Sequence, residues 1–444
     1  MAPVRWGRKR RPKISEVFNS DTSPHPDVFA TRTDGKVAAS PDEKPRSLQD
    51  RVASVLRRPG KHLVLWGFTG VGKTSLLKHT AKELKLSCLS IQASRPIDDR
   101  SAVEALLANI LAELGYERAL TRTNSASSSD TQELSLPIAK AGIEQSASEE
   151  VISAIEAHTL DRAVVRALSA SSYRILFIDA FEFIPDDERQ LAVEVLHNLM
   201  HELSDRASEN KNVTKIAIAG VADAAQELVP SSGPITRRVQ EIHVPTMSNA
   251  QLGEILDRGA KLLGLSFDDD ARKAIVAASD GFPFYAHHFA FYAVEEARLR
   301  SPSGLAKTVA HDDYQRSLEE AIEQAHLHLT NPYLRAIESS RRPQTRKRVL
   351  EAVADTGRRV SSLNDIRESY LRRHPDDASA RQAGFFQRPI RELVQQYGLL
   401  VELPQASNEG PLYRFRDPLM RAYVRLHALH PGLIPLHRDE VLAG

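Results

Sequence analysis

The sequence predicts an α/β domain with a parallel sheet and helices on both faces, followed by an all-α domain and a winged helix-turn-helix. Three features of the 444 residues indicate this order. Five short apolar segments alternate with helix-forming segments up to about residue 245, which is typical of a parallel α/β sheet. Only helical periodicity continues to about residue 330. The remaining chain fits three short helices followed by a hairpin.

The expected strands are short and continuously apolar, as in strands that are buried on both faces of a sheet. They cover residues 62–66, 86–91, 174–179, 215–220 and 240–244. Helices are expected around them at 48–56, 73–84, 101–114, 149–170 and 187–203, and in the following domain at 248–264, 268–279, 283–300 and 311–328. The C-terminal part favours helices at 345–356, 361–373 and 385–397, paired strands at 399–403 and 412–415, and a last helix at 418–429.

Composition indicates where these parts begin and end. Residues 1–45 are rich in Pro, Ser, Asp and basic residues, which predicts a flexible basic tail. A Ser-rich stretch at about 121–150 interrupts the first domain, and we interpret it as an insertion without a fold of its own. The expected domains are a core at 46–245, a helical lid at 246–330 and a winged-helix domain at 331–444.

The overall composition excludes several classes of protein. Hydrophobic residues make up 41% and charged residues 26%, which excludes a mainly disordered chain. Cys88 is the single cysteine, so a disulfide framework and a cysteine-based zinc site within the chain are both excluded. No apolar run approaches the roughly 20 residues that a membrane-spanning helix needs, and the basic N-terminus lacks the apolar segment of a secretory signal. We therefore expect a cytoplasmic protein without a membrane partner.

The formal net charge of +1 conceals an uneven distribution of charge. Residues 1–13 carry six basic and no acidic side chains, and residues 331–444 carry 19 basic and 13 acidic ones. The stretch between them therefore has a net charge of −11. Two basic ends could contact a polyanion such as double-stranded DNA. The alternative is an ordinary solvated surface.

A glycine-rich motif follows the first expected strand. The sequence GFTGVGKT at 67–74 matches G-x-x-x-x-G-K-[ST], and it lies after a buried strand and at the start of a helix, as the motif requires. Its glycines allow backbone N–H groups to point at phosphate oxygens, and the helix N-terminus adds a favourable dipole. Lys73 is expected to reach the β- and γ-phosphates, and Thr74 to bind Mg²⁺. The residues expected to bind nucleotide are Gly67, Phe68, Thr69, Gly70, Val71, Gly72, Lys73, Thr74 and Ser75.

An acidic residue ends the third expected strand. Asp179 stands where P-loop NTPases place the second acid that holds Mg²⁺, through water. Asp is also a preferred N-cap for a following helix, which is the alternative interpretation. The presence of the phosphate loop favours the metal-binding role, and the two motifs together predict a P-loop NTPase fold with Thr74 and Asp179 at the metal.

The region from about 46 to 330 resembles the AAA+/STAND division of P-loop ATPases. The resemblance rests on the phosphate loop, the strand that ends at Asp179, the pair Arg237 and Arg238, and the sequence Gly281-Phe282-Pro283. The last of these matches the G-x-P motif in the lid of STAND ATPases, where Pro283 would pack against the nucleotide. A Gly close to a Pro is also common at an ordinary helix boundary, which is the alternative interpretation. The order of sheet, lid and winged helix is similar to origin-recognition-like prokaryotic ATPases.

This resemblance implies ATP and Mg²⁺ as cofactors. It also implies a Glu directly after Asp179, because many AAA+ ATPases use that residue to polarise the attacking water. Ala180 occupies the position instead. Glu182 could replace the missing Glu, or hydrolysis could be slow. Glu182 is equally consistent with a simple surface acid.

The resemblance also implies further polar residues around the γ-phosphate. Arg237 or Arg238 would serve as an arginine finger, in cis or on a neighbouring copy, and the alternative is a solvated basic pair. Asp223 is the candidate sensor after the fourth strand. No sensor arginine is evident in the lid, where His287 and His288 occupy the neighbourhood or belong to the core.

The C-terminal part carries the candidate DNA contacts. In DNA-binding winged helices the third helix enters the major groove, and here it carries Gln387, Arg388, Arg391 and Gln395. Residues just before the domain could meet phosphates: Arg341, Arg342, Arg346, Lys347 and Arg348. In many STAND proteins the winged helix touches no DNA, which is the alternative. Without cysteines or grouped acids, no metal site is expected at His427, His430 and His437.

Two functions of different kinds agree with these features. The first is a Mg-dependent ATPase that acts on DNA as a nucleotide-driven switch or assembly factor, alone or as a homo-oligomer. The second is a STAND-type signalling ATPase that hydrolyses ATP slowly and acts through a protein partner, for example in prokaryotic defence. The chain shows no long sensor repeat or effector domain, which favours the first function. A nucleotide kinase is less well supported, because no acceptor-site domain is evident.

Overall fold

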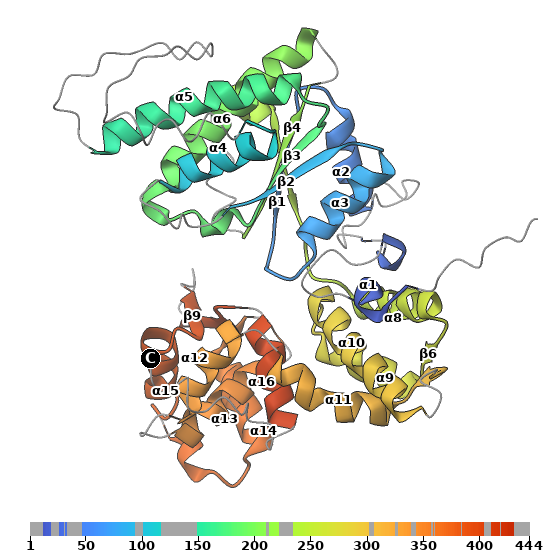
Figure 1. Ribbon diagram of the computed structural model, residues 1–444. Helices are drawn as coiled ribbons and strands as arrows, with labels where there is room; N and C mark the ends of the chain where they lie inside the picture. Colours follow the sequence, from blue (N-terminus) through green and yellow to red (C-terminus); the bar gives the residue numbers. More distant parts are fainter. Residues whose placement is uncertain are drawn as a thin grey trace, which may run out of the picture. The chain divides into compact units, whose positions relative to one another are not determined.

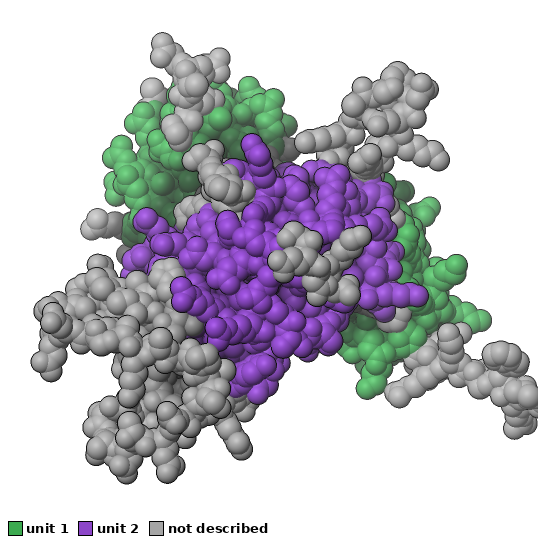
Figure 2. All heavy atoms as spheres, turned by 90° about the horizontal axis from the view of Figure 1, so that it is seen from above, with its two compact units in different colours: residues 1–30, 69–72, 246–444 green, residues 31–68, 73–245 purple. Residues whose placement is uncertain are grey.

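The computed structural model describes most of the chain, in two compact units. The described residues are 12–18, 26–30, 32, 47–93, 101–116, 149–209, 213–221, 234–301, 306–324, 327–338, 343–356, 358, 360–382, 384–403, 410–417 and 419–429. One unit consists of residues 31–68 and 73–245, and the other of residues 1–30, 69–72 and 246–444 (Figure 2).

The first unit is built on a five-stranded parallel sheet, which confirms the predicted fold class. Its strands are β1 (His62–Trp66), β2 (Cys88–Gln92), β3 (Ile175–Asp179), β4 (Lys215–Gly220) and β5 (Val239–His243). Their order in the sheet is β2-β3-β4-β1-β5. Because the strands are parallel, their carboxyl ends meet at one edge of the sheet, where ligand sites of open α/β sheets lie.

Helices cover both faces of this sheet, as predicted (Figure 1). The helices are α2 (Leu48–Arg57), α3 (Lys73–Glu83), α4 (Ala102–Glu113), α5 (Glu149–Ala170) and α6 (Asp186–Glu209), with short 3₁₀ turns η4 (Phe181–Phe183) and η5 (Pro234–Arg237). Helices α4, α5 and α6 lie on one face, and α2 and α3 on the other. Fully buried side chains such as Leu107, Leu196 and Ile218 fill the space between the sheet and the first group of helices.

A buried histidine connects three elements of this unit. His62 is the first residue of β1 and is 1% exposed. Its Nδ1 accepts a hydrogen bond from the backbone N–H of Ile216 in β4, at 2.9 Å. Its Nε2 therefore carries the proton and lies 2.9 Å from the carbonyl oxygen of Met200 and 3.0 Å from the hydroxyl of Ser204 in α6. Burial lowers the pKa of His62 to about 3, so the ring is neutral.

The helical lid belongs to the second unit. Its helices are α8 (Asn249–Leu263), α9 (Asp269–Ala278), α10 (Pro283–Arg300) and α11 (His311–Glu323). The expectation that only helices lie between residues 246 and 330 was wrong in one detail. The two-residue strands β6 (Ser266–Phe267) and β7 (Thr308–Val309) form a short parallel pair, and a segment of two residues is too short to show any periodicity in the sequence.

Part of the predicted flexible tail packs against this lid. Helix α1 (Ile14–Val17) and the 3₁₀ turn η1 (Pro26–Val28) are ordered, so the prediction of an unstructured tail was wrong for these segments. Phe18 is 1% exposed and lies on α8 at Gly259, where a Cβ would approach the Phe18 ring to 2.3 Å. Only glycine leaves enough space for this ring. Arg258 in the same helix donates to the carbonyl of Phe29, at 2.6 Å.

The rest of the second unit is a winged helix-turn-helix, as predicted. Its elements are α12 (Leu327–Glu338), α13 (Pro343–Ala354), β8 (Ser361–Ser362), α14 (Leu363–Arg373), the 3₁₀ turn η6 (Ala378–Arg381), α15 (Gln387–Arg391), the π-helical turn η7 (Glu392–Gln396), β9 (Leu400–Leu403), β10 (Leu412–Phe415) and α16 (Leu419–Leu429). Strands β8, β10 and β9 form an antiparallel sheet in that order. The third predicted helix is therefore a short α-helix that continues as a π turn, and β8 adds a third strand to the wing.

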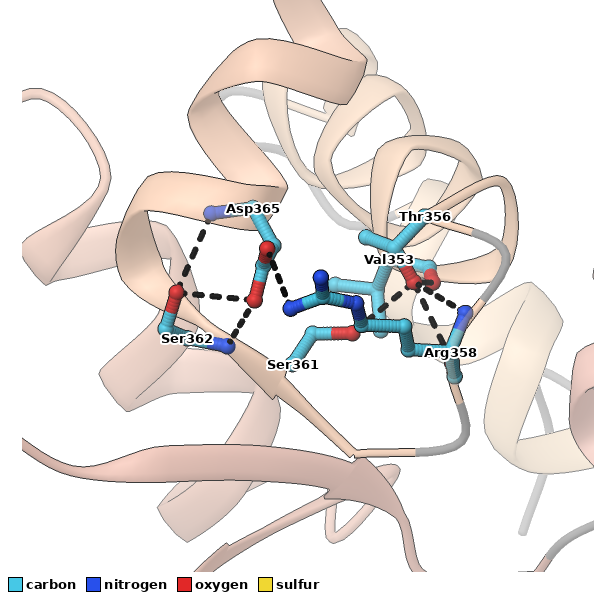
Figure 3. A network of polar contacts seen from close by, with 6 residues as sticks. All are labelled: Val353, Thr356, Arg358, Ser361, Ser362 and Asp365. Carbon is cyan, nitrogen blue, oxygen red and sulfur yellow. Dashed lines mark hydrogen bonds and ion pairs between the residues drawn. The ribbon is translucent and has the colours of Figure 1, made fainter.

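Local polar contacts fix where the second helix of this motif begins (Figure 3). The hydroxyl of Ser362 accepts from the N–H of Asp365, at 3.2 Å, and a carboxylate oxygen of Asp365 accepts from the N–H of Ser362, at 2.9 Å. This reciprocal pair is a capping box. Arg358 donates to the same carboxylate at 3.0 Å. The capping pair explains why α14 starts two residues later than the sequence prediction.

Several predicted features lie outside the described residues. These are residues 121–148 of the insertion predicted at about 121–150, and Asp223, Arg341, Arg342, His430 and His437. Among the helices that are described, none combines the length and apolar character that crossing a membrane requires. The described residues also contain no group of three or more His, Cys, Asp or Glu side chains arranged to hold a metal ion.

The buried position of His62 predicts a pH-dependent stability. The folded state holds this ring neutral, with a pKa of about 3 against 6.5 in the unfolded chain. The stability that the folded state gains from the neutral ring is therefore complete above pH 6.5. It is lost as the pH falls toward 3, at up to about 1.4 kcal/mol per pH unit. The test compares the free energies of unfolding of the parent and of His62→Gln, measured by urea denaturation. We expect the value for the parent minus the value for the variant to decrease as the pH falls from 6.5 to 4.5. A difference that stays constant over this range would contradict the prediction.

Candidate functional site

The glycine-rich motif forms the turn between β1 and α3. Helix α3 begins at Lys73, directly after the turn. The Lys73 side chain folds back over the loop, and its Nζ donates to the carbonyls of Gly67 and Phe68, each at 3.0 Å. Lys73 is 8% exposed, and burial lowers the pKa of its ammonium group. The carboxylates of Glu182 and Asp179 act in the opposite direction, which places both near the Lys73 nitrogen.

The hydroxyl of Thr74 meets the carboxylate at the end of β3. Thr74 Oγ1 donates to Asp179 Oδ2 at 2.5 Å. The strands that lead to these two residues are not neighbours, because β4 lies between β1 and β3. The structure therefore brings together the two residues that the sequence predicted as metal ligands, from positions 105 residues apart.

Glu182 reaches the same edge of the sheet through an unusual turn. Ala180 has a left-handed backbone, with φ of 59° and ψ of 45°, which is uncommon for a residue other than glycine. The turn leads into η4, which carries Glu182. The Oε2 atom of Glu182 is buried and has no hydrogen-bond partner among the described residues. It would lie 3.5 Å from a Cβ built on Gly220. Because Gly220 ends β4 without a side chain, there is space beside this carboxylate.

The structure separates the roles of the two arginines before β5. Arg238 donates to the carbonyl of His201, at 2.9 Å, and to the carboxylate of Asp205, at 2.7 Å, so it holds the end of β5 against α6. Arg237 is exposed, and its backbone carbonyl accepts from Lys61. Of the pair, Arg237 has the side chain that is accessible to another molecule.

The Gly-x-Pro corner contacts the tip of the phosphate loop within the second unit, to which residues 69–72 belong. Pro283 is the first residue of α10. The next N–H, of Phe284, points at the carbonyl of Gly70 at 3.4 Å. Gly70 has φ of +77°, and a Cβ there would lie 3.2 Å from a methyl group of Leu419 and 3.3 Å from Phe284. This crowding was not visible in the sequence, because Leu419 is about 350 residues away along the chain.

The two lid histidines are core residues. His287 is 5% and His288 is 7% exposed. His288 Nε2 lies 2.7 Å from the carbonyl of Ala321. Burial lowers the pKa of His287 to about 4, and its ring lies beside Phe18. His427 is likewise buried, between the rings of Tyr333 and Tyr423. His287 and His288 therefore belong to the core, which was one of the two interpretations that the sequence left open for them.

The winged helix presents polar side chains on its third helix. Exposed residues there are Gln387, Arg388, Arg391 and Gln395. The expectation that Arg346 meets phosphates was wrong. Arg346 is 2% exposed and donates to the carbonyl of Ala336 at 2.7 Å and to Glu392 at 2.9 Å, so it ties α12 to the third helix. Arg348 remains 44% exposed, and Lys347 is partly exposed.

The site residues fit a nucleoside triphosphate and a divalent cation. A glycine loop opens a helix, and a buried ammonium group lies over the loop. A hydroxyl and a carboxylate oxygen stand side by side, which is a donor set that Mg²⁺ prefers. Together, the parallel sheet and this loop define a P-loop NTPase.

Comparison with known proteins makes this class more specific. Residues 63–241 match the family described as ATPase family associated with various cellular activities (AAA). This part of the chain is therefore an AAA ATPase domain. A search of the curated proteins returned no match.

Solved structures with a similar arrangement share little sequence with this chain. The ORC2 protein of Aeropyrum pernix in ADPNP–ADP complexes is 15% identical, with a TM-score of 0.44, over 91% of this chain and 98% of that one. The ORC1 protein of the same organism in complex with DNA is 16% identical, with a TM-score of 0.39, over 89% and 92%. The RuvB Holliday junction branch migration motor of Thermotoga maritima is 15% identical, with a TM-score of 0.38, over 82% and 90%.

The crowding at the loop tip predicts a graded effect of two glycine substitutions. Gly70 and Gly115 both have positive φ, of 77° and 87°, but nothing lies within 4 Å of a Cβ on Gly115. Both Gly70→Ala and Gly115→Ala should lower the free energy of unfolding by about 1 kcal/mol through backbone strain. Gly70→Ala should cost more, because Leu419 and Phe284 must move. A double variant with Leu419→Ala should recover part of the extra cost. Equal losses for the two glycine variants in thermal denaturation would contradict this packing.

Proposed function

We propose that this protein binds ATP with Mg²⁺ at the phosphate loop, hydrolyses it, and uses the nucleotide state as a switch on DNA. The observation that carries the first part is the convergence of Lys73, Thr74 and Asp179 at the carboxyl edge of the sheet. A buried lysine, a hydroxyl and a carboxylate at this place are the parts that P-loop ATPases use to hold phosphates and the metal.

Each of these residues has a distinct role in this proposal. The backbone N–H groups of residues 67–75 bind the phosphates, and Lys73 leaves its loop carbonyls to reach the β- and γ-phosphates. Thr74 and Asp179 would hold Mg²⁺. When bound, the metal ion offsets the negative charge of the phosphates. Pro283 is proposed to pack against the nucleotide, which is supported by the N–H of the next residue, Phe284, pointing at the carbonyl of Gly70 in the loop tip.

Glu182 is the proposed residue that orients the attacking water. A carboxylate oxygen without a hydrogen-bond partner is available to accept a proton from water. The left-handed turn at Ala180 supports this assignment, because it shows how an acid two positions after the usual one can reach the edge of the sheet. Arg237, with its exposed side chain, is the proposed arginine finger toward a neighbouring copy. Arg238 is proposed to position the strand that follows.

The DNA part of the proposal rests on charge and exposure in the winged helix. Residues 331–444 carry six more basic than acidic side chains. Arg388 and Arg391 lie exposed on the third helix, which enters the major groove in DNA-binding members of this fold. Arg388 also pairs with Glu392 at 2.9 Å, so DNA would have to compete for this guanidinium.

Three variants separate catalysis from folding. We expect Lys73→Ala to abolish ATP turnover and Glu182→Gln to lower it by about 100-fold or more while ATP still binds. Glu241→Gln is the matched control, because Glu241 is an exposed acid on β5 of the same sheet. Turnover is measured by phosphate release, with and without duplex DNA. Tight ATP binding without turnover in the parent would refute the hydrolysis mechanism and favour a slow switch that acts on a protein partner.

A second prediction tests the DNA contact. The variant with both Arg388→Gln and Arg391→Gln should bind duplex DNA more weakly. If the two arginines contact phosphates, the slope of log K against log salt should fall by about 2. Arg316→Gln on α11 is the control, because it removes an exposed arginine outside the winged helix. Fluorescence anisotropy with a labelled duplex gives both quantities. Identical affinities for the parent and the double variant would rule out this helix as the DNA contact.

A further inference from the structure

A second concentration of positive charge lies in the winged-helix part, away from its third helix. A pocket of about 310 Å³ opens there, with walls that include Asp355, Ser369, Arg372, Arg373, Arg421 and Arg425. Its arginines come from the last turn of α14 and from α16. Helix α15 lies on the opposite side of α13 from α16 (Figure 1). The pocket is therefore separate from the proposed DNA-reading surface.

The sequence places these guanidinium groups together for simple geometric reasons. Arg421 and Arg425 are four residues apart in α16 and share one face of the helix. Arg421 is 7% exposed, and its Nε donates to the carbonyl of Ala354 at the end of α13, at 3.0 Å. This bond holds α16 against α13, so that both α16 arginines face the end of α14.

The acidic neighbours compensate these arginines only partly. Asp355 pairs closely with Arg373. The Nε of Arg425 is 3.6 Å from Asp355 Oδ1, and its Nη1 is 3.8 Å from Asp280 Oδ1. Arg421 Nη1 is 3.7 Å from Asp280 Oδ2. These separations exceed hydrogen-bond length, so N–H groups of both α16 arginines can donate to a better-placed acceptor.

The charge balance of the pocket remains positive. Glu351 is 3.7 Å from Arg373 and is the third acid in reach. Arg372, which is exposed, has no ion pair with any residue that the structure describes. Four arginines against three acids leave one positive charge without compensation.

A buried hydroxyl adds a second, independent sign of a ligand. Ser369 lies in α14, is 1% exposed and lines the pocket. Its Oγ has no hydrogen-bond partner among the described residues. Buried hydroxyl groups are nearly always paired, and an O–H beside guanidinium groups is a donor for an anionic oxygen.

We propose that this pocket binds a phosphate group of a small anion such as pyrophosphate. Planar guanidinium forks match the geometry of phosphate oxygens, and the serine hydroxyl supplies a further donor. The volume lies at the lower end of the range for small-molecule sites. Among the described residues no aromatic side chain lines the walls to stack on a base, so the site recognises phosphate rather than a whole nucleotide. The anion competes with Asp280 for Arg421 and Arg425.

The test measures pyrophosphate binding to the full chain by isothermal titration calorimetry. All variants carry Lys73→Ala, which removes binding at the phosphate loop, and the difference from the parent reports that loop separately. We expect Arg372→Gln with Arg425→Gln to weaken binding by about tenfold or more, because charge-assisted hydrogen bonds are lost. Arg358→Gln should change it less than about twofold. Arg358 is 69% exposed and pairs with Asp365 at the opposite end of α14, so it is the matched control.

Two further measurements keep the proposal testable. If the double arginine variant fails to fold, as judged by circular dichroism, Ser369→Ala should still weaken pyrophosphate binding by a few-fold. Displacement of pyrophosphate by a short DNA duplex would identify the DNA backbone as the source of the phosphate, and no displacement would identify a free anion. Absence of pyrophosphate binding in the Lys73→Ala chain, or equal affinity in the pocket variants and the control, would overturn the proposal.

Discussion

The hydrogen bond between Thr74 and Asp179 is the contact on which the arrangement of the site depends. It joins the first turn of α3 to the end of β3, although β4 separates the strands that lead to these residues. The contact is available only because all three strands run parallel and end at one edge. The register of the sheet, with Ile178 beside Ile218 and Leu65 beside Ala219, sets the height at which the strands end. The apolar sequences of the strands therefore position the polar chemistry.

The buried polar groups of this domain fall into two kinds. His62 uses both ring nitrogens, toward α6 and β4, and stays neutral, so it is a structural connection. Lys73 and Glu182 differ from it. Among the described residues, the lysine nitrogen donates only to carbonyls of its own loop, and one oxygen of the glutamate has no partner. Buried polar groups left in this state reduce stability. Their position beside Asp179 is the reason to connect that cost with function.

The sequence was sufficient to predict the strands of the sheet and to predict that Thr74 and Asp179 lie at one place. Continuous apolar runs identify buried strands, and the phosphate-loop motif has a fixed geometry, so both could be predicted without a structure. The ordered segment at Phe18 could not, because its role depends on the missing side chain of Gly259, far away along the chain. The contact of Gly70 with Leu419 escaped prediction for the same reason. Sequence periodicity reports which face of an element is apolar, but not which distant element covers it.

A count of basic residues in the C-terminal part does not distinguish buried arginines from exposed ones. The excess of six basic side chains suggested DNA contacts on the third helix and in the segment just before the domain. In the structure, Arg346 is buried and bridges α12 to Glu392, while Arg388 and Arg391 are exposed on the third helix. Arg421 and Arg425 belong to a third group, which lines a pocket and lies on α16. Burial separates the first two groups, since the buried guanidinium of Arg346 satisfies its donors within the protein, whereas the exposed ones of Arg388 and Arg391 can exchange water for a phosphate. A loss of DNA affinity on removing charge is therefore informative only when each group is changed separately.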